Sequence, residues 1–189
     1  MRPTIKAFFT AFLFSPIILL AEWIPVSSDQ PTEPKWIVNE VEINEIQIDF
    51  TLPGYNIEKL KNGKNKISFP GGVSILESGA PDLPLNAKSI MIPNVTNMKF
   101  SILESEYTEI GIEDIIPSKG NLTRNIDPNS IPHIYGNVYE KNEWYPQEIV
   151  YMRDPYIMRS IRGQTIVMQP IQYNPCLLYT SDAADDLVC

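Results

Sequence analysis

Short apolar runs separated by turn-forming residues are the main pattern along this chain. Alternating apolar positions over 41–50 predict a strand whose alternation shifts by one residue near Asn44 and Glu45, as a β-bulge or a change of face would produce. No window shows the sustained period of an amphipathic helix. Further predicted strands lie at 89–92, 99–103, 107–112, 148–152 and 165–168.

Turn-forming residues between these apolar runs indicate the fold class. Asn62-Gly63, inside a polar stretch, predicts a hairpin between Ile57 and Ile67. Residues 79–84, Gly-Ala-Pro-Asp-Leu-Pro, predict a rigid link into the next strand. Many short strands with turns between them, in a chain with 17 prolines, favour an all-β fold over a helical or βαβ fold. We therefore predict an antiparallel β-sandwich.

The N-terminus has the pattern of an export signal. Arg2 and Lys6 precede an apolar stretch over 7–20, and the small residue Ala21 comes next. A stretch this short is not expected to form a stable membrane anchor, although an uncleaved N-terminal helix is the alternative. Residues 1–21 are therefore predicted to be a signal peptide, and the protein to be secreted, either periplasmic or extracellular.

The remaining chain divides into three parts. Residues 22–34, which contain three prolines, are predicted to be an extended and mobile leader. Residues 35–175 form the predicted sandwich. Residues 176–189 contain both cysteines of the chain and resemble translated sequencing-adapter read-through, so we interpret them as a non-native tail.

Composition narrows the possible functions. The chain has a net charge of -8 and no basic cluster, so it has no electrostatic means of binding nucleic acid. Residues 22–175 contain no cysteine, which excludes disulfides and a thiol nucleophile from this part. A domain of about 150 residues can nevertheless bury enough apolar surface to fold.

Residues suited to catalysis are scarce. His133 is the only histidine, and a lone histidine between Pro132 and Ile134 is more often a packing or loop residue than a base or a ligand. A zinc site would lack cysteine partners, and no Gly-x-Ser-x-Gly or phosphate-binding glycine loop is present. We predict a non-catalytic protein without a metal or cofactor.

One segment has the features of an exposed binding loop. Residues 117–125 read Pro-Ser-Lys-Gly-Asn-Leu-Thr-Arg-Asn, with Gly120 permitting a turn and Pro128 and Pro132 stiffening the next part of the chain. Arg124 is therefore expected to project from the surface, where a partner can bind it. The alternative is that Arg124 is an ordinary solvated charge.

A series of motifs along the chain occurs in a specific order and spacing: the segments 79–84 and 117–125, Ile126-Asp127-Pro128, 132–136, Trp144-Tyr145-Pro146, 154–159, Arg162-Gly163-Gln164 and 172–175. On these motifs the chain over 79–175 resembles the N-terminal prodomain of gingipain-type (C25) cysteine peptidases. The resemblance implies a β-sandwich that belongs to a peptidase precursor and is itself not catalytic. It also implies a further strand after Gln-Tyr-Asn-Pro, so that this chain would lack its last strand.

The resemblance also assigns roles to residues. Arg124 would occupy the primary specificity pocket of the peptidase, flanked by Thr123 and Asn125, and would block the active site. Lys119 is a weaker rival that would suit a lysine-specific enzyme. Arg159 and Arg162 also match the family, and their spacing of three between predicted strands favours structural ion pairs or contact with the enzyme surface.

The implied partner is the peptidase domain in cis, which the prodomain would keep latent and help to fold. The alternative function is a secreted carbohydrate- or surface-binding β-sandwich. It depends on a set of aromatic residues that could pack in the core and interfaces or form a sugar-stacking platform. An exported enzyme of unknown chemistry is disfavoured by the residue inventory. The aromatic set is Tyr135, Tyr139, Trp144, Tyr145, Tyr151, Tyr156 and Tyr173.

Overall fold

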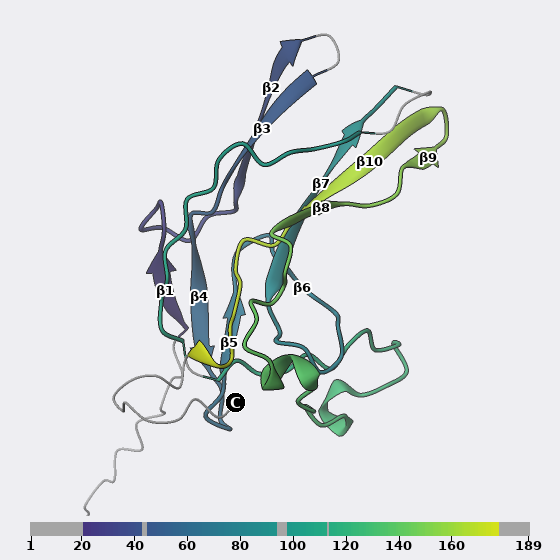
Figure 1. Ribbon diagram of the computed structural model, residues 1–189. Coiled ribbons are helices and arrows are strands. Elements are labelled where there is room, and N and C mark those ends of the chain that lie inside the picture. The colour runs from purple at the N-terminus through teal and green to yellow at the C-terminus, as the bar shows by residue number, and fades with distance from the viewer. Residues whose placement is uncertain (1–20, 43–44, 94–97, 113, 178–189) are drawn as a thin grey trace, which may run out of the picture.

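The protein folds into antiparallel sheets, as a computed structural model of residues 21–42, 45–93, 98–112 and 114–177 describes it (Figure 1). This part contains two short 3₁₀ helices and no α-helix, which confirms the all-β prediction. The first sheet has the order β1-β4-β5, from β1 (Glu22–Pro25), β4 (Gly54–Lys59) and β5 (Asn65–Ser68). The second contains β6 (Val73–Ser74), β7 (Pro84–Met91), β10 (Ile161–Met168), β8 (Val150–Met152) and β9 (Tyr156–Met158). A separate hairpin consists of β2 (Lys35–Glu42) and β3 (Glu45–Thr51).

Strand β10 organises the larger sheet. One edge of β10 pairs with β7 over 163–168, and the opposite edge pairs first with β9 and then with β8. The 3₁₀ helices η1 (Pro128–Ser130) and η2 (Asn137–Glu140) lie in the long connection between β7 and β8. That connection carries most of the residues predicted to be functional.

The core lies between the two larger sheets. Tyr55 and Ile67, from β4 and β5, belong to the same buried cluster as Leu85 and Val167, from β7 and β10. Leu83 and Val167 are completely inaccessible to solvent. Burial of apolar side chains from two facing sheets is the main stabilising term expected for a β-sandwich.

The hairpin predicted from Asn62-Gly63 is confirmed. Ile57 of β4 pairs directly with Ile67 of β5. Gly63 has a φ of 81°, a left-handed conformation that favours glycine. The turn is closed by hydrogen bonds between Leu60 and Lys64 and between Gly63 and Leu60.

The single strand predicted over 41–50 is wrong. The chain reverses direction between Glu42 and Glu45, which pair with each other as the last residue of β2 and the first of β3. The shift in alternation therefore marks a chain reversal. A separate irregularity in the register lies between Glu40 and Glu42.

The leader predicted over 22–34 is not detached from the domain. Residues 22–25 form β1 and pair with β4, and Val26, Ser27 and Ser28 all donate backbone N–H groups to the carbonyl oxygen of Pro53. The proline content suggested a mobile leader, but an edge strand tolerates proline because only one of its sides must pair.

Two predicted strands, 99–103 and 107–112, are also wrong, since the described residues 98–112 contain no strand. Their apolar side chains stay largely exposed, with Leu103 at 78% and Tyr107 at 83%. Alternating composition favours an extended chain, but a strand also needs a neighbouring backbone to pair with. The run predicted over 148–152 contains the shorter strand β8.

Both predicted terminal segments fall almost wholly outside the described residues. Of the signal peptide only Ala21 is described, and of the tail only Cys176 and Leu177. Cys176 is buried, and its backbone N–H donates to Asn174 Oδ1 at 3.0 Å. No helix among the described residues is long and apolar enough to span a bilayer.

Candidate functional site

Residues 119–135 leave the sandwich and return to the same place, and we call this segment the 119–135 loop (Figure 1, green segment at lower right). At its start, Ser118 donates to Ala80 O at 2.8 Å and accepts from Gly79 N at 2.9 Å. At its end, Gly136 N donates to Gly79 O at 2.9 Å. Gly79 therefore holds both ends of the loop against the buried Ala80–Pro81 segment.

The position of Gly79 requires a glycine. Its φ is 83°, and a side-chain Cβ built there would lie 3.2 Å from the Cα of Gly136. Gly136 in turn approaches Gly79 O so closely that an added Cβ would lie 3.0 Å from it. Sequence reasoning treated Gly79 only as part of a rigid link; its place before Ala80-Pro81 was the available signal.

Hydrogen bonds inside the loop restrict its shape. Lys119 Nζ donates to the carbonyl oxygen of Pro128 at 2.6 Å. His133 Nδ1 lies 2.6 Å from the carbonyl oxygen of Pro117, so this nitrogen carries the proton and donates. The Asp127 side chain accepts from Asn129 N and caps η1. The loop is therefore braced from within.

Arg124 lies in a β-turn at the exposed part of this loop. Ile126 N donates to Thr123 O at 3.1 Å, which leaves Arg124 and Asn125 as the two central residues of the turn. Thr123, Arg124 and Asn125 are all exposed. Within the described part of the chain, the Arg124 guanidinium makes no hydrogen bond or ion pair. It is therefore available to a partner.

The two basic residues predicted as candidates in this loop, Lys119 and Arg124, differ in their contacts. The ammonium group of Lys119 is engaged within the loop by the Pro128 carbonyl, whereas Arg124 lies in the turn without such a partner among the described residues. This arrangement gives Lys119 a bracing role. It also makes Arg124 the better-presented of the two cations.

A group of tyrosines supports the return of the loop to the sandwich. Tyr135 donates to Asp114 Oδ1 at 3.0 Å, and Asp114 also forms an ion pair with Lys64. The hydrogen bond with Asp114 raises the pKa of the Lys64 ammonium group. Lys64 lies 5.3 Å from the centre of the Tyr135 ring. These contacts connect the loop to the β4–β5 turn.

Two further tyrosine hydroxyls are directed into the domain. Tyr139 donates to Ile115 O at 2.7 Å, and Tyr145 donates to Glu77 Oε2 at 2.9 Å. Burial raises the pKa of both phenols above the ordinary value. Tyr139 also contacts Tyr135 and Tyr173 edge to face. Tyr139, Tyr145 and Tyr173 are therefore packing residues, and they are not available for a sugar-stacking platform.

The two other predicted arginines lie elsewhere. Arg159 is in the turn between β9 and β10 with a φ of 58°, and Arg162 lies within β10, opposite Ile157. Among the described residues no carboxylate forms an ion pair with Arg159. The structure does not bring these arginines together with Arg124, because they lie at the outer end of the larger sheet (Figure 1).

Metal-binding side chains do not cluster in the described part of the chain. There, no three His, Cys, Asp or Glu side chains lie close enough together to hold an ion. The imidazole of His133 is used in the backbone contact with Pro117.

Known proteins have sequences similar to this chain. The Propeptide_C25 family matches residues 36–179. Gingipain R1 of Porphyromonas gingivalis is 34% identical over 132 residues, which cover 68% of this chain and 13% of that protein. Gingipain R2 of the same species is 38% identical over 108 residues, or 57% of this chain and 15% of that protein. The chain thus spans only a small part of these relatives.

Solved structures show the same fold. A complex of the pro- and mature domains of P. gingivalis RgpB matches with a TM-score of 0.67 and 31% identity, covering 76% of this chain and 77% of that chain. A structure concerned with the zymogenic latency of gingipain K from P. gingivalis matches with a TM-score of 0.64 and 19% identity, covering 82% and 89%. This chain therefore belongs to the Propeptide_C25 family, the non-catalytic propeptides of gingipain-like C25 cysteine peptidase precursors.

Proposed function

We propose that this domain keeps a secreted C25 cysteine peptidase latent by inserting Arg124 into the specificity pocket of the enzyme. The observation that carries the proposal is the presentation of Arg124. It lies in the centre of a hydrogen-bonded turn, is exposed, and has no partner among the described residues. The match to the RgpB pro- and mature-domain complex supports a peptidase domain as the partner.

The chemistry of arginine suits this role. A guanidinium group is permanently charged and planar, so it can enter a narrow pocket and make paired hydrogen bonds to a carboxylate. Thr123 and Asn125 would lie at the rim of that pocket. In a precursor the two domains are covalently linked, so the effective concentration of the loop is on the order of millimolar. Modest intrinsic affinity is then enough for latency.

The bracing of the loop explains how a substrate-like segment can inhibit. The loop is closed at Gly79 and tied internally by Lys119, so it enters the cleft as one preorganised unit. Preorganisation reduces the entropy lost on binding. The same contacts would hold the two ends in place if the peptide bond after Arg124 were cut.

The test is inhibition of gingipain R2 by the purified chain, compared with Arg124→Ala and Arg124→Lys. We expect the alanine variant to raise the inhibition constant by roughly 30-fold or more, the equivalent of about 2 kcal/mol. The lysine variant should also bind weakly, because an ammonium group does not make the paired contact. Lys61→Ala, at an exposed site in the β4–β5 turn, is the matched control. Equal inhibition by wild type and Arg124→Ala would reject the pocket role.

Export forms the second part of the proposal. Residues 1–21 carry the charge and apolar pattern of a signal peptide. Expression of the complete chain in a Gram-negative host, followed by mass measurement of the protein outside the cytoplasm, would give a mature species that begins near Glu22. A full-length product retained in the cytoplasm would contradict export.

A further inference from the structure

The outer end of the larger sheet carries an uncovered apolar surface, which we call the methionine face. It consists of Met91, Tyr156, Met158 and Ile161. In the strand register Met91 and Tyr156 flank Gly163 from opposite sides, and Met158 pairs with Ile161. Paired residues of antiparallel strands direct their side chains to the same face. The four side chains therefore form one cluster across three strands.

These side chains are unusually accessible. Met91 is 73% exposed, Met158 62% and Ile161 49%. The same sheet face, six residues from Met91 along β7 and six from Ile161 along β10, carries Leu85 and Val167, which are buried in the core. The methionine face therefore belongs to the side of the larger sheet that faces the core, at the end of that sheet which the smaller sheet does not cover. A surface of this kind is typical of a binding site.

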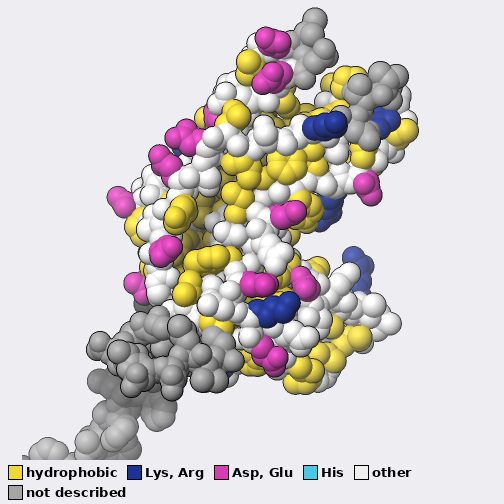
Figure 2. All heavy atoms as spheres, viewed as in Figure 1, with side chains coloured by type: hydrophobic (Ala, Val, Ile, Leu, Met, Phe, Trp, Pro, Cys, Tyr) yellow, Lys and Arg dark blue, Asp and Glu magenta, His cyan; other side chains and the backbone are white. Residues whose placement is uncertain are grey.

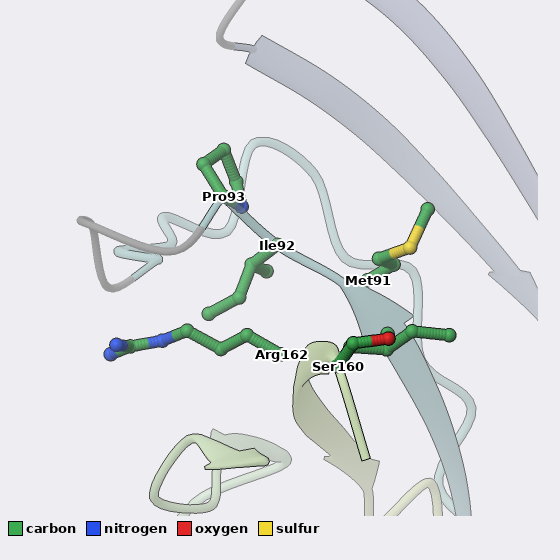
Figure 3. Close-up of a pocket in the computed structure, with 6 residues that line it drawn as sticks. Met91, Ile92, Pro93, Ser160 and Arg162 are labelled. Atoms are coloured by element: carbon green, nitrogen blue, oxygen red, sulfur yellow. The ribbon is translucent and has the colours of Figure 1, made fainter. Parts of the chain in front are cut away.

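One cation, Arg159, adjoins the methionine face, whereas Arg162 lies on the opposite face of β10 from Ile161 and Gly163. Arg159 is exposed in the turn that joins β9 to β10. Met91, Ile161 and Arg162 help to line an open hollow of about 440 Å³ beside it. Figure 3 shows the Arg162 side chain extending away from the strands on one side, with Met91 and Ser160 on the other. Methionine and arginine are both enriched at protein interfaces.

Charged side chains of both signs lie on the face shown in Figure 2. Asp and Glu side chains follow its left edge and also lie in its centre and lower part, while the Lys and Arg side chains in view lie mostly on its right half, mixed with acidic ones. A hollow separates the upper sheet from the lower loops on that right side. The 119–135 loop and the β9–β10 turn lie on the same side in Figure 1. One partner could therefore contact both.

The 119–135 loop alone offers too little surface for a stable complex. Specific protein interfaces bury roughly 800 Å² on each partner, contributed by about 20–30 residues. The 119–135 loop has 17 residues, and Lys119, Asp127 and His133 are engaged in contacts within it or with its start, so it offers less surface than such an interface needs. We propose that the methionine face, with Arg159 at its edge, is a second docking surface for the C25 peptidase domain. This inference rests on the proposed function.

Other occupants fit less well. A second copy of this chain is disfavoured because the net charge of -8 makes copies repel one another. The exposed apolar residues over 98–112 are interspersed with Glu104, Glu106 and Glu109. This segment starts beside β10, where Met98 N donates to Gln164 Oε1, and then crosses to the opposite side in Figure 1. The peptidase domain is the occupant that can reach the methionine face and the loop together.

The test is binding of the complete chain to gingipain R2 whose active-site cysteine has been alkylated by an arginyl chloromethyl ketone. The alkylating group fills the specificity pocket, so binding to this enzyme excludes the Arg124 contact. We expect measurable binding of wild type, weakened roughly tenfold or more by Met91→Thr combined with Met158→Thr. Arg159→Asn, which tolerates the left-handed turn conformation, should weaken binding to a smaller extent.

The matched control is Ile37→Thr combined with Val41→Thr, at comparably exposed apolar positions of β2, outside the methionine face. It should bind within about twofold of wild type. Equal binding by wild type and the methionine-face variant, or no binding of wild type to the alkylated enzyme, would overturn the proposal. Self-association of the chain that depends on Met91 and Met158, without an effect on peptidase binding, would assign the face to a second copy instead. Inhibition of the unmodified enzyme by Arg124→Ala as strongly as by wild type would reject the pocket role separately.

Discussion

Lys119 illustrates how the structure changes the interpretation of a single residue. The sequence made it a second candidate for the specificity pocket, because it lies in the same loop as Arg124 and carries the same charge. Its ammonium group instead donates to the Pro128 carbonyl. The side chain therefore acts across the loop, which sequence spacing alone does not reveal.

We predict that Lys119→Met weakens inhibition of gingipain R2 by roughly threefold to tenfold while Arg124 still provides most of the affinity. The substitution keeps the aliphatic stem but removes the donor to Pro128 O, and an exposed hydrogen bond contributes about 1 kcal/mol. Inhibition constants for Lys119→Met, Arg124→Ala and the double variant measure the energetic coupling between Lys119 and Arg124. If Lys119→Met abolished inhibition and Arg124→Ala did not, the roles of the two residues would be reversed.

Tyr139 gives a prediction about pH. Burial raises its folded-state pKa above the unfolded value of about 10, so the folded protein keeps this proton to higher pH than the unfolded chain. Below pH 10 both states are protonated and this stabilisation is fully present. As pH rises from 10 towards the folded-state pKa, the free energy of unfolding should fall by about 1.4 kcal/mol per pH unit for this tyrosine.

The measurement is urea unfolding between about pH 8 and pH 11.5, a range that brackets the unfolded pKa of tyrosine, with phenolate absorbance recorded for the folded protein. Tyr139→Phe should remove its share of the alkaline decrease, although it also loses the hydrogen bond to Ile115 O and so is less stable near neutral pH. A variant that kept the full alkaline slope would show that Tyr139 is not responsible for it.

Among the elements of the fold, those defined by local signals were predictable. The β4–β5 hairpin follows from Asn62-Gly63 because Gly63 readily adopts the left-handed conformation that the chain reversal needs. The segment 98–112 has equally good strand composition but no strand. Pairing depends on distant backbone, and a local pattern cannot supply that information.

The same distinction applies to the candidate site. Prolines and Gly120 were enough to predict an exposed loop around Arg124, since their conformational effects are local. The closure of the loop at Gly79 joins residues about 40 to 60 positions apart in sequence and was visible only in the structure. The neighbouring pair of Gly79 and Gly136 became significant only when the fold brought them into contact.

We predict that Gly79→Ala destabilises the domain more than Gly63→Ala. Both glycines have φ near 80°, so both substitutions carry a left-handed strain of about 1–2 kcal/mol. A Cβ at Gly63 meets open space, whereas one at Gly79 would crowd Gly136 and disturb the closing hydrogen bond of the loop. Urea unfolding measures the free energy of unfolding of each variant. The inhibition constant for gingipain R2 reports whether the loop is still held in position. Equal effects of the two variants would show that loop closure at Gly79 is unimportant.

At the scale of the whole molecule, residues 79–85 connect the 119–135 loop to the hydrophobic core. This segment leaves the loop anchor at Gly79, passes through the buried Ala80, Pro81 and Leu83, and enters β7. It also pairs with the segment that begins the loop, through the Pro81–Pro117 bridge. Stability of the core and presentation of Arg124 are therefore expected to depend on the same residues.

Leu83→Ala tests this connection. Leu83 is fully buried, so truncation should lower the free energy of unfolding by about 2–5 kcal/mol through lost burial and a residual cavity. Leu103→Ala removes the same atoms from a side chain that is 78% exposed, and should change stability by no more than about 0.5 kcal/mol. Urea unfolding followed by tyrosine fluorescence provides both values. If core and loop are coupled, Leu83→Ala also inhibits gingipain R2 less strongly under conditions where it remains folded. Unchanged inhibition by folded Leu83→Ala would show that the loop is held independently of the core.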